Sequence, residues 1–162
     1  MNKSWWLLAL LLPLMTACQL NRQRLPLATA LPLRDVVVEL SPLADKYRLD
    51  EPILMTFTVT NTGTHAVRIS RWSSPLEGRF TTDYLDVHRK RERILYTGDR
   101  LHRNPWLLKD FVTLHPGERL ACEVDLSRNY AITEGGRYEV RFRGSGLNRL
   151  PDSDPVEIKI KD

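Results

Sequence analysis

Apolar and polar residues alternate along much of the chain from residue 35 onward. In residues 53–59, Ile53, Met55, Phe57 and Val59 alternate with leucine and threonine. A period of two residues is typical of a strand that buries one face and exposes the other. Further runs that predict strands are residues 36–40, 65–70, 80–88, 93–97, 111–114, 119–127, 137–143 and 156–160.

Turn-forming residues separate these runs. Residues 61–64 follow the run 53–59 and predict a turn, since Gly63 can take a positive φ. Residues 65–70 then return as its hairpin partner. The basic residues 88–93 predict a second turn, which joins residues 80–88 to residues 93–97.

No stretch shows a helical period of three to four residues. Short strands broken by Gly, Pro and Asn predict an all-β fold, an immunoglobulin-like antiparallel β-sandwich. Beyond Cys18 the sequence holds one cysteine, Cys122, so the domain has no disulfide and relies on apolar packing. Because Cys122 lies on the apolar side of residues 119–127, we expect a buried free thiol rather than a reactive one.

The N-terminus has the features of an export signal. Lys3 precedes the apolar residues 5–14, which are too few to cross a bilayer that needs roughly 20. Thr16 and Ala17 then lead to Cys18, with Met15 where leucine is commonest, and this resembles a lipobox. The resemblance implies removal of residues 1–17 and lipidation of Cys18, with palmitate among the acyl groups. A plain secretory signal with an incidental cysteine and a permanent membrane helix are the alternatives.

The remaining chain divides into a tether and a domain. Residues 18–34 contain two prolines and no regular period, which predicts a lipid-anchored tether. Residues 35–162 are long enough for one β-sandwich domain. Several acyl chains give durable anchoring. Gln19, where an aspartate would favour the inner membrane, points to the outer membrane of a cell envelope, facing the periplasm.

Charge changes this picture little. The formal net charge is +4, and basic residues are dispersed apart from residues 88–93. That cluster lacks interleaved aromatic residues and a helix to carry it into a groove, so we expect no nucleic-acid partner.

The sequence offers no catalytic constellation. No His-Glu-x-x-His occurs, and His65, His88, His102 and His115 have no helical ligand spacing. Residues 144–146 lack the spacing of a serine nucleophile elbow. We therefore expect no enzyme, no cofactor and no metal site. Carboxylates that meet only in space, such as Asp83, Asp86 and Asp99, stay open.

The loop of residues 71–78 concentrates candidate binding residues. It holds Trp72, Pro75, Leu76 and Glu77 between two predicted strands. Large apolar side chains in such a loop often anchor a protein partner. The alternative is that Trp72 folds back and plugs the open end of the sandwich. The same two alternatives apply to Trp106 in the longer loop that follows.

An ordered series of short motifs carries a family resemblance. It runs from residues 61–63 through residues 71–78, 83–87, 96–98, 110–118 and 125–130 to residues 136–140. The series, spanning residues 36–143, resembles the N-terminal domain of deuterolysin-type (aspzincin) zinc metallopeptidases. The resemblance implies a propeptide-like domain, which assists folding of a catalytic domain and keeps it latent. The zinc-binding catalytic part of that family has no counterpart in this sequence, so peptidase activity is not implied.

These observations lead to a principal hypothesis and two others. The principal one is a non-catalytic, lipid-anchored envelope module that binds protein, as inhibitor or folding helper of an exported zinc metallopeptidase. Its expected contacts are Trp72, Pro75, Leu76, Glu77 and Trp106, with Glu77 near zinc or a basic group. The second is a structural or accessory lipoprotein that joins an envelope or secretion assembly through a strand edge. The third is a degenerate peptidase that still binds zinc.

Overall fold

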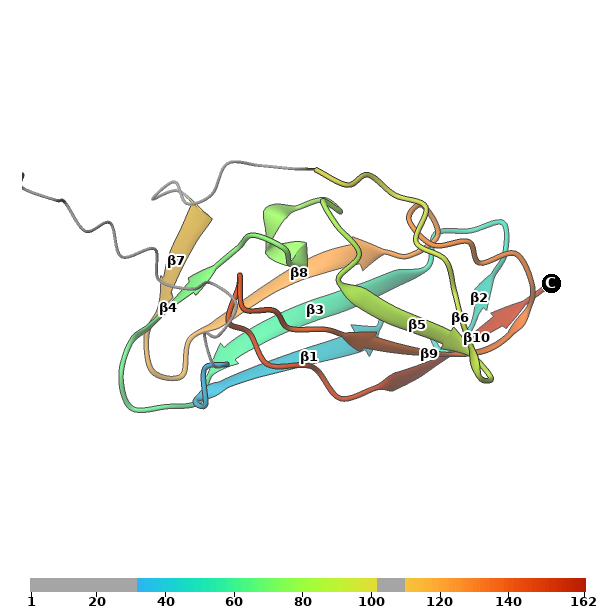
Figure 1. The fold of residues 1–162 in the computed structure, drawn as a ribbon. Helices are drawn as coiled ribbons and strands as arrows, with labels where there is room; N and C mark the ends of the chain where they lie inside the picture. Colours follow the sequence, from blue (N-terminus) through green and yellow to red (C-terminus); the bar gives the residue numbers. More distant parts are fainter. Residues whose placement is uncertain (1–31, 102–109) are drawn as a thin grey trace, which may run out of the picture.

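The alternating residues of the sequence form the two faces of antiparallel sheets (Figure 1). The computed structural model describes residues 32–101 and 110–162. Its elements are β1 (Val36–Pro42), β2 (Tyr47–Arg48), β3 (Leu54–Asn61), β4 (Val67–Ser70), the 3-10 helix η2 (Pro75–Glu77), β5 (Leu85–Arg89), β6 (Glu92–Arg93), β7 (Phe111–Leu114), β8 (Arg119–Asp125), β9 (Gly136–Phe142) and β10 (Val156–Lys161). In this described part, no helix has the length and apolar character needed to span a bilayer.

The strands pair in an immunoglobulin-like order. One sheet has the order β1-β3-β8 and the other β2-β10-β9-β5-β6, while β4 and β7 form a small sheet of their own. All pairs are antiparallel except β2 with β10, which is parallel. The orders β1-β3-β8 and β10-β9-β5 match strands A-B-E and G-F-C of an immunoglobulin sandwich. The predicted fold class is therefore confirmed.

The core lies between β3 and β9, whose inward-facing residues the alternation predicted. Met55, Phe57 and Val59 of β3 are fully buried, and so are Val140 and Phe142 of β9. The rings of Phe57 and Phe142 meet edge to face with centroids 4.9 Å apart, which joins the two sheets.

The predicted hairpin of residues 53–59 with residues 65–70 is wrong. β3 is a central strand, with both edges taken by β1 and β8, while β4 pairs with β7. The side-chain amide of Asn61 holds the chain after β3 away from a hairpin. Its Nδ2 donates to the carbonyl of His65 at 2.8 Å and to that of Leu114 at 2.9 Å, and this ties the chain after β3 to the end of β7.

The turn at residues 61–64 does not use a positive φ at Gly63. Among the described glycines, positive φ values occur at Gly78, Gly117 and Gly136. Gly63 is needed for a close approach instead, because a Cβ there would lie 2.6 Å from the Cβ of Asp35.

The strand predicted at residues 80–88 is shorter than expected. β5 begins at Leu85, and Phe80 stacks its ring on Tyr84, with centroids 4.9 Å apart. The turn between β5 and β6 matches the predicted basic hairpin, with Lys90 at φ 57°. The returning strand is limited to Glu92–Arg93, so the run predicted at residues 93–97 is mostly irregular.

Candidate binding site

The loop of residues 71–78 is shaped by its own sequence. The Ser74 hydroxyl donates to the carbonyl of Arg71 at 2.6 Å, and Pro75 begins η2, where its fixed φ fits. Gly78 ends the turn at φ 76°, and its N–H donates to the carbonyl of Pro75 at 2.9 Å. The loop therefore has a defined backbone beside η2.

The carboxylate of Glu77 points back into this loop. Its Oε2 accepts hydrogen bonds from the N–H of Ser73 at 3.1 Å and from the hydroxyl of Thr81 at 2.5 Å. Ser73 takes a positive φ of 57°, and its carbonyl accepts from Nδ2 of Asn148 at 2.8 Å. Glu77 thus fixes the loop in the unbound chain. Its role as a partner contact stays a prediction.

The other predicted contacts differ in how much they are covered. Pro75 is buried, Leu76 packs against the core while partly exposed, and Trp72 is half-buried. The structure therefore brings Trp72, Pro75, Leu76 and Glu77 together in one loop. Cys18 and Trp106 lie outside the described residues.

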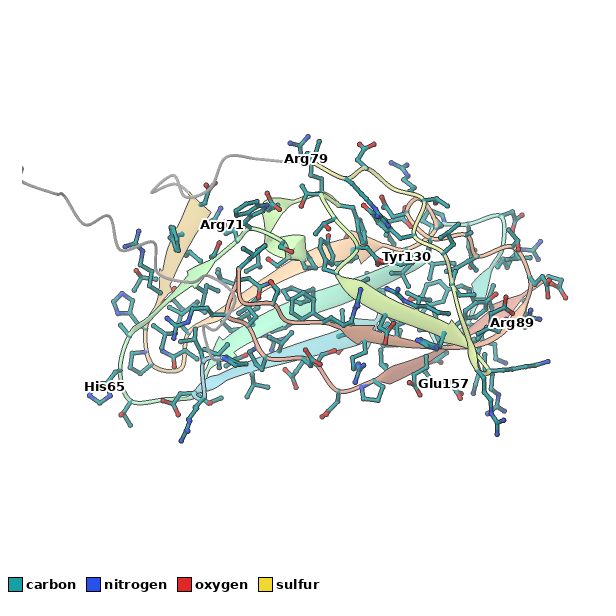
Figure 2. All side chains as sticks on the ribbon, in the orientation of Figure 1. His65, Arg71, Arg79, Arg89, Tyr130 and Glu157 are labelled. Atoms are coloured by element: carbon teal, nitrogen blue, oxygen red, sulfur yellow. The ribbon has the colours of Figure 1, made fainter. Side chains whose placement is uncertain are left out.

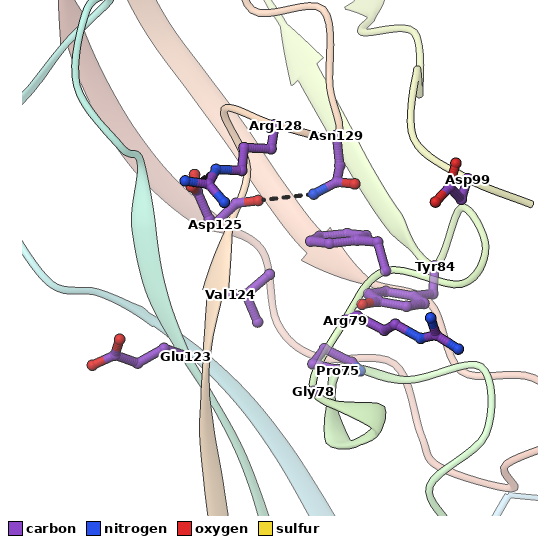
Figure 3. Close-up of a pocket in the computed structure, with 11 residues that line it drawn as sticks. Pro75, Gly78, Arg79, Tyr84, Asp99, Glu123, Val124, Asp125, Arg128 and Asn129 are labelled. Atoms are coloured by element: carbon purple, nitrogen blue, oxygen red, sulfur yellow. Dashed lines mark hydrogen bonds and ion pairs between the residues drawn. The ribbon is translucent and has the colours of Figure 1, made fainter.

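A cleft of about 360 Å³ opens beside this loop (Figure 3). The stacked rings of Phe80 and Tyr84 and the buried Pro75 form one wall, and Val124 of β8 faces them. The cleft is lined by Pro75, Gly78, Arg79, Phe80, Tyr84, Asp99, Glu123, Val124, Asp125, Arg128 and Asn129.

The rim of the cleft carries charges of both signs. Nε of Arg128 lies 3.4 Å from a carboxylate oxygen of Asp125, so these two charges compensate each other. Among the described residues, no hydrogen bond or ion pair engages the side chains of Arg79, Asp99 or Glu123. Those three groups are available to a ligand. Figure 2 shows Arg79 on the same side of the molecule as Arg71, far from Arg89 and Glu157.

Tyr84, which lines the cleft, and Tyr130, whose ring contacts Phe80, are structural. Burial raises the pKa of Tyr84 and that of Tyr130 far above the ordinary phenol value. The hydroxyl of Tyr130 accepts from the N–H of Leu85 at 3.1 Å and donates to Oδ1 of Asp83 at 3.0 Å. Both phenols are therefore neutral near pH 7 and stabilise the site by packing and hydrogen bonding.

In the described part of the chain, neither a reactive thiol nor a set of metal ligands is found. Burial raises the pKa of Cys122 to about 11, so its thiol is protonated at neutral pH. Within residues 32–101 and 110–162, no three His, Cys, Asp or Glu side chains gather in a way that would hold a metal ion.

A separate ionic cluster lies on the outer face of β5, β6 and β9. Nη2 of Arg93 lies 2.9 Å from Asp83 and its Nε 3.0 Å from Asp86, which Arg141 also approaches at 3.3 Å. Nη2 of Arg143 donates to the carbonyl of Asp83 at 3.1 Å. The guanidinium groups compensate the charges of both carboxylates and join the strands of this sheet.

Most residues that line the cleft were not predicted from the sequence. Arg79 and Phe80 directly follow the candidate loop and carried a usable signal, because they continue its cluster of large side chains. Val124, Arg128 and Asn129 come from the end of β8 and the turn after it. Nothing in the sequence links that distant segment to the loop.

Comparison with known proteins finds a sequence relative and more distant structural ones. No family model matches the chain. Over 92 residues the chain is 27% identical to a protein named extracellular protease from Aeromonas hydrophila, a match that covers 57% of this chain and 26% of that protein. The chain thus spans about a quarter of the length of the curated relative it matches.

Two solved structures show similarity at low identity. A β-glucosidase from Erythrobacter marinus is 14% identical with a TM-score of 0.41, over 77% of this chain and 15% of that one. A CARDB domain from Pyrococcus furiosus, in complex with di-metal ions, is 16% identical with a TM-score of 0.39, over 83% of this chain and 96% of that one. Likenesses of this degree carry neither ligand nor activity to this chain.

Proposed function

We propose that this chain is a non-catalytic, lipid-anchored module of the cell envelope that binds an exported zinc metallopeptidase and acts as its inhibitor or folding helper. The observation that carries the proposal is the 92-residue similarity to part of an extracellular protease. The match covers 26% of that protein's length, so the similarity is confined to one part of it. A segment that resembles part of a protease can make the contacts that this part makes with the rest of the protease.

The geometry of the loop supports a binding role. Trp72 and Leu76 are partly exposed on a loop whose backbone is held by Glu77 and Ser74. Large side chains on a preorganised backbone lose little conformational freedom when they bind, which favours their use as anchors. The adjoining cleft, with apolar walls and a charged rim, offers a partner both burial and polar contacts.

The membrane part of the proposal rests on the sequence before Cys18. Acylation there would hold the module at the outer membrane, on its periplasmic face. Incorporation of labelled palmitate by the wild-type chain and its loss in Cys18→Ser test this step. Incorporation that persists in Cys18→Ser would contradict it.

The protein partner is tested by capture from the native envelope in mild detergent. We expect a zinc peptidase to co-purify that is inactive in the complex and active once separated. Trp72→Ala should reduce its capture roughly fivefold or more, as expected for an interface anchor, while the urea unfolding midpoint is unchanged. Lys159→Ala, at an exposed position on β10, is the control.

Two results would argue against this function. Unfolding of Trp72→Ala would mean that the indole plugs the open end of the sandwich. In that case Arg71→Glu, at an exposed position in the same loop, would test whether this surface binds the peptidase. Capture of structural envelope proteins alone would favour the second candidate, an accessory lipoprotein of an envelope or secretion assembly. The half-exposed Val37 on the edge strand β1 favours that candidate as a pairing site.

A further inference from the structure

The outer edge of β8 is open in the described part of the chain. β8 pairs with β3 on one side, and no described strand pairs with it on the other. In a constant-type immunoglobulin sandwich, strand D occupies this position beside strand E. Alternate residues of an antiparallel strand direct their N–H and C=O groups away from the neighbouring strand. The backbone of Arg119–Asp125 therefore presents donors and acceptors that another strand can use.

The cleft borders the same strand. Val124 and Asp125 belong to β8, and Pro75 and Tyr84 lie across the cleft from Val124 (Figure 3). Leu120 and Cys122, on the same face of β8 as Val124, are only half-buried. An extended segment that pairs with the edge would therefore direct alternate side chains toward the apolar walls and these exposed surfaces.

The charges at the rim favour a basic occupant. With Asp125 compensated by Arg128, the remaining rim groups are the carboxylates of Asp99 and Glu123 and the guanidinium of Arg79. Carboxylates outnumber cations among these groups, so a lysine or arginine in the occupant gains a favourable interaction.

We propose that β8 and the adjoining cleft accept an extended polypeptide segment of a protein partner, which carries at least one basic residue and adds to the sheet as a new strand. Backbone hydrogen bonds give such strand addition its affinity, and pockets for alternate side chains give it selectivity. The inference rests on the proposed function, because it says where on this chain the partner binds.

Three short synthetic peptides of equal length test the inference with the purified full chain. One alternates lysine and valine, one alternates glutamate and valine, and one is an N-methylated copy of the first that cannot complete the backbone ladder. We expect only the first to bind, by fluorescence anisotropy, and to slow amide hydrogen exchange in β8. Equal binding of the N-methylated peptide, or protection confined to β1, β2 or β6, would overturn the proposal.

Charge reversal at the rim gives a second measurement. Glu123→Lys should weaken binding of the lysine–valine peptide by roughly twofold to fivefold, the range expected for one exposed ion pair. Glu39→Lys on β1 is the matched control, since Glu39 is exposed on the same sheet at its other edge. Equal weakening by both variants would mean that only the net charge of the protein matters, and it would overturn the assignment of the peptide to this cleft.

The test separates this inference from the proposed function. A captured peptidase that slows exchange only outside β8 would keep the function and overturn the inference. Binding of the lysine–valine peptide along β8 without capture of any peptidase would support the inference and count against the function.

Discussion

At the scale of single residues, the side chains that matter most are those whose polar atoms are turned inward. Glu77 is an acidic residue in a surface loop, yet its carboxylate accepts from Ser73 and from the buried hydroxyl of Thr81. The hydroxyl of Tyr130 likewise forms hydrogen bonds with Asp83 and with the backbone of Leu85. Such residues fix the conformation of the segments around them.

Removal of the Glu77 carboxylate should therefore loosen the loop. Glu77→Ala leaves the N–H of Ser73 and the hydroxyl of Thr81, which is 1% exposed, without their acceptor. We expect a loss of about 1–3 kcal/mol in the free energy of unfolding, measured with urea. The exposed Glu39→Ala should change it by less than about 0.5 kcal/mol. An unaltered stability in Glu77→Ala would mean that the carboxylate is held for a partner rather than for the fold.

At the scale of elements, opposite charges on neighbouring strands join the outer face of one sheet. Partial burial alone would raise the pKa of Asp86, but the hydrogen bond from His88 and the charges of His88, Arg143 and Arg93 lower it below its ordinary value. Because the folded pKa is below the unfolded one, near 3.9, the carboxylate stabilises the fold above that pH. The contribution is lost as the pH falls through the folded pKa.

This linkage predicts a pH-dependent effect of Asp86→Asn. At pH 7 the variant should be less stable than the wild type by about 1 kcal/mol, the upper range for exposed ion pairs, since several cations are involved. The difference should shrink toward pH 3, when urea unfolding is measured at both values. Asp45→Asn, an exposed carboxylate in the turn before β2, is the control. A difference that stays constant with pH would contradict the electrostatic origin.

At the scale of the whole molecule, apolar contacts between the sheets hold the domain together. Cys122 is the only described cysteine and is free, so no disulfide contributes within the described residues. The contact of Phe57 with Phe142 links the central strands of the two sheets. Packing at this contact therefore contributes to a free energy of unfolding that is typically about 5–15 kcal/mol for a domain.

Substitution of Phe142 tests this share. Phe142→Ala should lower the free energy of unfolding by about 3–5 kcal/mol, because it leaves a cavity between the sheets. Phe142→Leu should cost less, since it retains most of the apolar volume. Leu95→Ala, at a side chain 68% exposed, should have almost no effect in the same urea titration. A loss below about 1 kcal/mol in Phe142→Ala would contradict the assigned core.

The sequence by itself determined the strands and their inward faces. Alternation identified β3, β8, β9 and β10, because burial of one strand face imposes a period of two residues. Short β-branched or apolar runs indicated β1 and β7. The same local pattern indicated the all-β class and placed Phe57, Val140 and Phe142 in the core. The cluster of Trp72, Pro75, Leu76 and Glu77 in one loop was also visible without the fold.

Only the tertiary structure decided which strands pair and what the loop contacts. β3 pairs with β1 and β8 instead of β4, because its neighbours are chosen by the packing of two sheets and by the amide of Asn61. The cleft joins residues 75–84 to residues 123–129, which no spacing in the sequence relates. Local patterns report how a residue faces the interior, whereas contacts between distant segments depend on chain connectivity in three dimensions.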